Sequence, residues 1–243
     1  MALPSGSFWP YTTAHFALHN FSQVNMEPNE FVPFFILYLY HMTSDQKRDN
    51  LQEPSASYDK QYTYADYLKF DFDHMVELIK GQLFKMSPAP HPDHQKVSLG
   101  FTLSLGTYLE KKSCQLFHAP FDVILPIENR KLESANTVVQ PDLCVICDVD
   151  KITDAGCVGA PDLVIEILSP STAKKDMTDK YEIYEQSGVK EYWTISVRNK
   201  LVQVFLLDKG RYGRPQIYND KDTISPSMFP DLEIDLSRVL NIR

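Results

Sequence analysis

The chain has 243 residues, 43% of them hydrophobic, so it is long enough to bury one sizeable core. Its 24 basic and 32 acidic residues give a formal net charge of −8, which excludes a long-range positive field; any site for a polyanion must be local. The chain has four cysteines but is too large to need disulfides for its stability, and it has no secretory signal. These features predict reduced thiols and a cytoplasmic location.

Residues 1–56 differ from the rest, because aromatic residues are scattered among Ser, Asn and Pro without a clean period. We expect a poorly structured N-terminal extension there, of which residues 1–41 add little to the fold, and one folded domain over residues 57–243. The apolar run at 31–40 is about half of the roughly twenty residues that cross a bilayer, so no membrane segment is expected.

Short elements open the folded part. Thr63 is a good N-cap for a helix over residues 64–70. Apolar stretches at 75–79 and 82–86, joined by a Lys-Gly turn, predict a β-hairpin that carries Glu77 in its first strand.

A longer helix is predicted over about 94–112, because apolar residues recur there at helical spacing. Its expected apolar face consists of Val97, Phe101, Leu103, Leu105, Tyr108 and Leu109. Strands are predicted at 115–127 and 138–147, and the second contains Asp142 directly after a proline. We expect the helix to pack on the sheet that these strands help to form.

The central strand is predicted at 163–168, where Leu, Val and Ile dominate a run bounded by prolines. A helix capped by Asp176 and stopped by Gly188 leads to a strand at 191–197, which makes a βαβ unit with a right-handed crossover. Two further strands are predicted at 201–207 and 211–218.

Glu166 is the anomaly of the central strand, because a carboxylate in apolar surroundings loses solvation worth several kcal/mol unless a partner replaces the water. It is either half of a buried pair, a residue at a wet sheet edge, or a metal ligand. Asp142 opens another apolar strand, so both carboxylates could meet at one end of the sheet. Two such ligands with space for water describe a magnesium site.

Lys180 can supply the cation that this site needs. The position two residues beyond Glu166, on the same strand face, is Leu168 rather than a lysine. The following helix must start near the same sheet end, which keeps Lys180 within reach of Glu166, and Tyr184 shares its helix face. Pairing with a helix aspartate on a solvated face is an equal alternative.

A long run of residues resembles a known family. It comprises Pro141-Asp142, residues 160–172, Asp176, Lys180, Tyr184, Gly188-Val189 and Glu191-Tyr192-Trp193. Over roughly residues 60–240 the chain resembles the restriction-endonuclease-like family expanded in cyanobacteria, within the PD-(D/E)XK nuclease superfamily. The resemblance implies an α/β fold with a mixed central β-sheet flanked by helices and an N-terminal β-hairpin, and an endonuclease-like domain over residues 57–243.

The resemblance also implies a site. Asp142 and Glu166 would bind Mg²⁺ or Mn²⁺, with the Ile167 carbonyl as a further ligand. Glu77 would be an outer or second-metal carboxylate, and Lys180 would replace the missing motif lysine and orient the attacking water.

The implied function is a divalent-metal-dependent DNA endonuclease that hydrolyses phosphodiester bonds with metal-activated water. The alternative is a non-catalytic nuclease-like module that binds nucleic acid or a protein partner, which the acidic balance and Leu168 favour. A homodimer is allowed for, and no membrane partner is expected.

Other residues receive structural interpretations. Cys144 and Cys147 lie three apart on a predicted strand and face opposite ways, so core thiols are expected rather than a zinc site. His94 is expected to cap the helix or to neighbour the metal ligands. Lys174-Lys175 could touch a phosphate backbone, but a solvated loop is the expected role. The aromatic residues expected to pack in the core are Tyr181, Tyr184, Tyr192 and Trp193.

Overall fold

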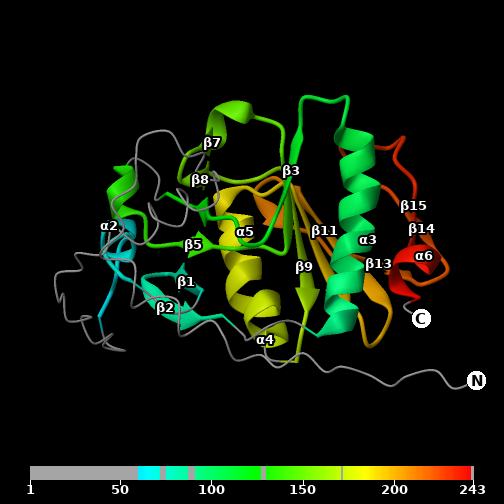
Figure 1. The fold of residues 1–243 in the computed structure, drawn as a ribbon, viewed down its shortest axis with the longest axis horizontal. Coiled ribbons are helices and arrows are strands. Elements are labelled where there is room, and N and C mark those ends of the chain that lie inside the picture. The colour runs from blue at the N-terminus through cyan, green and yellow to red at the C-terminus, as the bar shows by residue number, and fades with distance from the viewer. Residues whose placement is uncertain (1–59, 72–74, 87–90, 127–129, 171, 242–243) are drawn as a thin grey trace, which may run out of the picture. The chain divides into compact units, whose positions relative to one another are not determined.

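The computed structural model describes residues 60–71, 75–86, 91–126, 130–170 and 172–241 (Figure 1). The expected N-terminal extension, including the apolar run at 31–40, lies outside these residues. In the described part of the chain, no helix is long and apolar enough to cross a membrane.

The helices are α2 (Tyr64–Tyr67), α3 (Pro92–Leu109), α4 (Ala173–Lys175), α5 (Tyr181–Ser187) and α6 (Leu236–Leu240), with short helical turns η2 (Leu132–Ser134), η3 (Val149–Lys151) and η4 (Asp176–Lys180). The strands are β1 (Val76–Ile79), β2 (Gln82–Lys85), β3 (Gln115–His118), β4 (Val123–Ile124), β5 (Val138–Val139), β6 (Leu143–Ile146), β7 (Ile152–Thr153), β8 (Gly156–Val158), β9 (Leu163–Leu168), β10 (Glu191–Ser196), β11 (Leu201–Asp208), β12 (Arg211–Tyr212), β13 (Gln216–Asn219), β14 (Thr223–Ile224) and β15 (Ile234–Asp235).

The main sheet is mixed, as predicted. Its strands follow the order β12-β11-β10-β9-β6-β3, and β13 pairs with β11. Strands β9 and β10, which precede and follow α5 in the sequence, pair in parallel, while β6 pairs antiparallel with β9. A second sheet, β2-β1-β5-β4-β8-β7, contains the predicted hairpin, whose turn residues Lys80 and Gly81 have φ of 49° and 83°.

Prolines divide two strands that the sequence pattern predicts as continuous. Residues 115–127 contribute β3 to the main sheet and β4 to the second, and residues 138–147 divide in the same way into β5 and β6. Pro120 and Pro141 lie at the breaks, and each lacks the N–H that a ladder would need. The uninterrupted strands were therefore wrong predictions.

The core lies on both faces of the main sheet. On one face, Phe101 of α3 packs edge-on against Trp193 at 6.0 Å, together with Ile165 and Ile167 of β9. On the other face, Tyr184 of α5 and Val164 of β9 belong to a second cluster. Figure 1 shows the sheet between α3 and α5. Since successive β9 side chains alternate between these clusters, Glu166 points toward α5.

The apolar face of α3 is narrower than predicted. Val97, Phe101, Leu105 and Leu109 are buried, but Leu103 is 60% exposed. Two residues advance a helix by roughly 200°, so Leu103 cannot share a face with Phe101 and Leu105.

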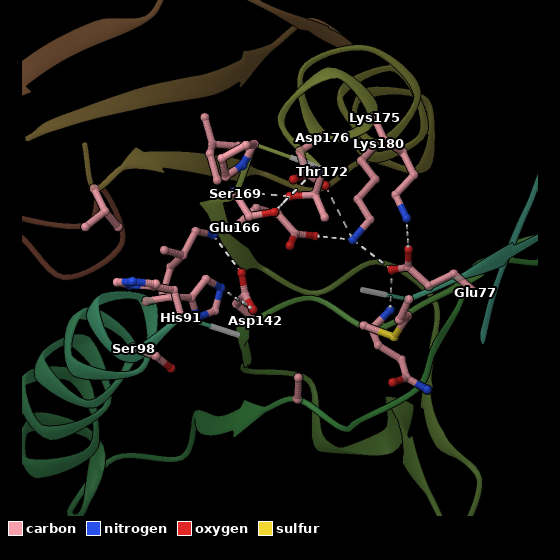
Figure 2. Close-up of a pocket in the computed structure, with 18 of the residues that line it drawn as sticks. Glu77, His91, Ser98, Asp142, Glu166, Ser169, Thr172, Lys175, Asp176 and Lys180 are labelled. Carbon is pink, nitrogen blue, oxygen red and sulfur yellow. Dashed lines mark hydrogen bonds and ion pairs between the residues drawn. The ribbon is translucent and has the colours of Figure 1, made fainter. Parts of the chain in front are cut away.

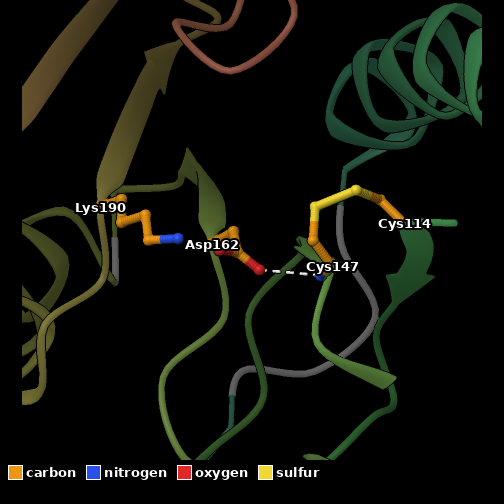
Figure 3. The surroundings of a disulfide bond; sticks show 4 residues. All are labelled: Cys114, Cys147, Asp162 and Lys190. Atoms are coloured by element: carbon orange, nitrogen blue, oxygen red, sulfur yellow. Dashed lines mark hydrogen bonds and ion pairs between the residues drawn. A yellow bond between two sulfur atoms is a disulfide. The ribbon is translucent and has the colours of Figure 1, made fainter. Parts of the chain in front are cut away.

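A disulfide corrects the prediction for the cysteines. Cys114 and Cys147 are bonded across the β3–β6 pair (Figure 3). Cys144 and Cys157 are buried free thiols. The register of β3 against β6 places positions 114 and 147 opposite one another. Reduced cysteines were one basis for the predicted cytoplasmic location, and the disulfide removes that basis.

Candidate active site

A cleft of about 1320 Å³ opens where β9 ends and α4 begins (Figure 2). It is lined by all the residues predicted to form the site: Glu77, Asp142, Glu166, Ile167 and Lys180. Strand β1, strand β9, the start of β6 and η4 each supply part of it. The four polar side chains that the sequence singled out therefore meet at one sheet end.

The antiparallel register of β6 and β9 brings Asp142 beside Glu166. Leu143 pairs with Ile165, so the next residue outward on β6 faces the next on β9. The Ile167 N–H donates to Asp142 Oδ2 at 2.7 Å, which fixes the carboxylate against the strand end.

The helix after β9 begins earlier than predicted. Asp176 is not an N-cap: the helical run starts at Ala173, and η4 is a π-helical turn in which Asp176 and Lys180 are buried. Such turns occur frequently at functional sites. Here the turn directs both side chains toward the cleft, and the predicted stop at Gly188 is confirmed by its φ of 86°.

The Lys180 ammonium lies among three carboxylates. Its Nζ is 2.7 Å from Glu77 Oε1, 2.8 Å from Glu166 Oε1 and 3.8 Å from Asp176 Oδ1. The lysine is 3% exposed, so this is a buried ion cluster rather than a solvated helix face. Figure 2 shows Lys180 between Glu166 and Glu77.

Glu77 is held by two cations. Its Oε2 accepts a hydrogen bond from Lys175 Nζ at 2.6 Å, and its Oε1 accepts the Gln140 N–H at 3.1 Å as well as contacting Lys180. Both oxygens are thus used by protein donors. The Glu77 side chain is also 1% exposed, against 22% for Asp142, so Glu77 is better placed to position Lys180 than to bind an outer metal.

The two glutamates respond in opposite ways to the same burial. Burial raises the pKa of Glu77, but the charges of Lys180 and Lys175 outweigh it and lower that pKa to about 2. Burial raises the pKa of Glu166 to about 8, because Lys180 opposes it incompletely and nearby carboxylates add to it. The carboxylates raise the pKa of Lys180 well above its ordinary value against the effect of burial.

The two oxygens of Glu166 have different surroundings. Oε1 accepts from Lys180 and from the Tyr184 hydroxyl, each at 2.8 Å. Within the described residues, Oε2 accepts no hydrogen bond. Tyr184 was predicted to share the helix face of Lys180 and to pack in the core; its hydroxyl also orients the carboxylate that lines the cleft.

His94 neighbours the candidate metal ligands. Its Nε2 lies 3.3 Å from Asp142 Oδ1, whereas the N-cap of α3 is His91. Burial lowers the pKa of His94, but the hydrogen bond and charge of Asp142 and the Ile167 backbone outweigh it, so the pKa is raised. His94 therefore carries positive charge more readily than an ordinary histidine.

The donor set fits a hard divalent cation. In the part of the chain that the structure describes, no three His, Cys, Asp or Glu side chains form a ready-made metal cluster. Asp142 and Glu166 offer carboxylate oxygens beside the Ile167 backbone, and Mg²⁺ takes one or two carboxylates and keeps several waters. Since burial raises the pKa of Glu166, a cation there would stabilise its charged form.

Three site residues were missed from the sequence. Lys175 was placed in a solvated loop, Asp176 was interpreted as a cap and Tyr184 as packing. The four-residue spacing of Asp176, Lys180 and Tyr184 was a usable signal, because it places them on one helix face. No local pattern could have paired Lys175 with Glu77, which is 98 positions away.

Glu77→Gln should destabilise the protein by about 3–5 kcal/mol, because it removes the charge that compensates two buried or half-buried ammonium groups. The matched control is Glu182→Gln, whose carboxylate also contacts a lysine at 2.6 Å but is 56% exposed. The control should lose less than about 1 kcal/mol. Urea unfolding at neutral pH measures both; equal effects would show that the cluster contributes no more than a surface pair.

Glu166→Gln should behave differently, since Lys180 keeps Glu77 and Asp176 as partners. With a folded-state pKa of about 8 against an ordinary 4.5, Glu166 holds a proton that the unfolded chain has lost. Between about pH 4.5 and pH 8, the free energy of unfolding of wild type should fall relative to that of the mutant by up to about 1.4 kcal/mol per pH unit. Above that range the difference should level off.

Urea unfolding in EDTA at about pH 5, 6.5 and 8 tests this difference between wild type and mutant. A mutant destabilised equally at every pH would instead make Glu166 half of a structural ion pair.

Comparison with known proteins bears on the fold and on the family. The chain is similar to a solved structure titled a "putative nuclease belonging to DUF820 from Anabaena variabilis", with a TM-score of 0.59 and 17% sequence identity. The match covers 73% of this chain and 97% of that chain. At this identity the likeness shows the fold, and it confirms the predicted fold class. No curated protein matches the chain.

A family model matches residues 62–237, which is more than half of the chain. The family is Uma2, described as "Putative restriction endonuclease". The predicted family is thereby confirmed: the chain belongs to the Uma2 family of restriction-endonuclease-like proteins.

Proposed function

We propose that this protein is a divalent-metal-dependent nuclease that hydrolyses phosphodiester bonds in DNA, acting as an endonuclease. The observation that carries the proposal is the pairing of two neighbouring carboxylates with a buried ammonium 2.8 Å from one of them. Membership of a restriction-endonuclease-like family supports the reaction class. DNA as substrate, Mg²⁺ or Mn²⁺ as cofactor, a homodimer and a cytoplasmic location remain predictions.

Asp142, Glu166 and the Ile167 carbonyl are the proposed ligands. When bound, a divalent cation supplies Lewis-acid stabilisation of the phosphate and makes water a better nucleophile at neutral pH. His94 steadies Asp142 through its contact at 3.3 Å. Tyr184 holds Glu166 Oε1, which leaves Oε2 for a ligand.

Lys180 takes the part of the lysine that Leu168 replaces. Its ammonium adjoins Glu166, donates a hydrogen bond toward the attacking water or a phosphate oxygen, and stabilises the charge that builds on the phosphate. Glu77 and Asp176 are positioning residues, because they hold the Lys180 side chain.

A non-catalytic nuclease-like module is the second candidate. The observation that favours it is the enclosure of Lys180, which is 3% exposed, with two carboxylates at hydrogen-bond distance and a third at 3.8 Å. An ammonium has three N–H donors, so a substrate reaches the remaining one only if this cluster opens. Cleavage assays separate the two candidates.

Asp142→Asn should abolish metal-dependent cleavage of plasmid and single-stranded DNA, with a loss greater than about 100-fold, since even residues that only orient metal ligands cost 10–100-fold. The matched control is Asp162→Asn, at the far end of the same strand pair. Asp162 Oδ2 accepts the Cys147 N–H at 2.8 Å, as Asp142 Oδ2 accepts that of Ile167, and Asp162 Oδ1 contacts Lys190 at 2.7 Å (Figure 3).

The control should retain wild-type cleavage, and EDTA should abolish cleavage by wild type. Cleavage that persists in EDTA or in Asp142→Asn would contradict the proposed site. A folded wild-type protein that cleaves neither substrate with Mg²⁺ or Mn²⁺ would favour the non-catalytic module.

A further inference from the structure

The cleft carries cations that the proposed chemistry does not use. Lys85, Lys174 and Arg198 line it, and all three are exposed. Among the residues that the structure describes, none of these side chains has an ion-pair or hydrogen-bond partner. By contrast, Lys175 and Lys180 in the same cleft are bound to Glu77.

The three cations come from separate elements around the cleft. Lys85 ends β2, Lys174 lies in α4, and Arg198 follows β10 in the turn to β11. Lys174 is adjacent to Lys175, but the three positions are far apart in the sequence, so no single run of basic residues contains them. The fold nevertheless gathers them at one opening of a protein whose net charge is −8.

The interior of the cleft is acidic. Glu77, Asp142, Glu166 and Asp176 outnumber Lys175 and Lys180 there. A polyanion that approaches these carboxylates is repelled unless nearby cations offset the charge, and exposed unpaired cations do so at the lowest desolvation cost. Lys85, Lys174 and Arg198 meet that requirement, because the described part of the chain gives them no competing partner to leave.

The lining favours a duplex over a single strand. Single strands are held largely by bases that stack on aromatic side chains. Phe84 is the only Phe, Tyr or Trp among the described lining residues, and the Lys175 ammonium lies 5.6 Å from its ring centroid. Apart from the imidazoles of His91, His94 and His118, the described lining therefore offers charges for phosphates and little aromatic surface for a base.

We propose that Lys85, Lys174 and Arg198 contact the backbone phosphates of double-stranded DNA and hold the duplex over the Asp142–Glu166 pair. This inference rests on the proposed function, since it names the substrate form that the same site takes. Each phosphate contact on a duplex contributes about 0.9 to the slope of log K against log salt concentration. Three contacts therefore contribute about 2.7.

The test is duplex binding in EDTA, where metal-dependent cleavage cannot occur, measured by fluorescence anisotropy over a range of NaCl concentrations. The triple variant Lys85→Gln, Lys174→Gln, Arg198→Gln should bind more weakly and lose about 2.7 from the magnitude of the salt slope. The matched control replaces two lysines and one arginine that are exposed, outside the cleft and without an ion-pair partner among the residues with described positions: Lys111→Gln, Lys209→Gln and Arg214→Gln.

The control variant should keep the wild-type slope. An unchanged slope in the cleft variant, or an equal fall in both variants, would overturn the phosphate contacts, and tighter binding of a single strand than of a duplex of equal length would overturn the duplex assignment. Wild-type cleavage with Mg²⁺ is measured separately. If the duplex binds in a way that depends on Lys85, Lys174 and Arg198 but is not cleaved, the proposed nuclease activity is contradicted and the phosphate contacts are supported.

Discussion

The buried Lys180 ammonium is the interaction on which the candidate site depends. Three carboxylates from β1, β9 and η4 surround it, so the second sheet, the main sheet and the helical layer meet through one charge. An isolated ammonium at this depth would be strongly unfavourable, and so would each carboxylate. The cluster therefore couples the packing of three elements to the geometry of the cleft. Its stabilisation is unequal: Glu77 gains from the shared cation, while Glu166 remains a carboxylate whose pKa burial raises.

The ends of the β6–β9 pair show how position rather than residue type decides a role. Asp142 and Asp162 each precede one strand and accept a main-chain N–H at the end of the other. Asp162 also contacts Lys190 and lies near the end that the Cys114–Cys147 disulfide closes (Figure 3). Asp142 instead borders the cleft beside Glu166. The same hydrogen-bond geometry thus serves a strand end in one place and a candidate ligand in the other.

The sequence predicts the parts of this fold in which local pattern and environment agree. The apolar run of β9 and the hairpin turn at Lys80-Gly81 were predicted and are confirmed, because their local signals are strong. The convergence of Asp142 and Glu166 was predicted from the place of each acid at the end of an apolar strand, and the antiparallel pairing of β6 with β9 brings it about. The Lys175–Glu77 pair could not be predicted, since only the tertiary fold joins positions 98 apart. The cysteine pairing depends on the register of β3 against β6. That register was not predicted, because the segments that contain β3 and β6 were each predicted as one unbroken strand.

The central claim is that Asp142 and Glu166, with the Ile167 carbonyl, form one divalent-cation site beside Lys180. Crystals of the protein soaked in Mn²⁺ test it directly, because anomalous scattering locates the ion independently of activity. The account predicts one ion bonded to both carboxylates at about 2.0–2.2 Å, with Lys180 still beside Glu166, since hard cations of this size bind carboxylate oxygens at that distance. An ion held elsewhere in the cleft, or none at a Mn²⁺ concentration that supports cleavage, would contradict it.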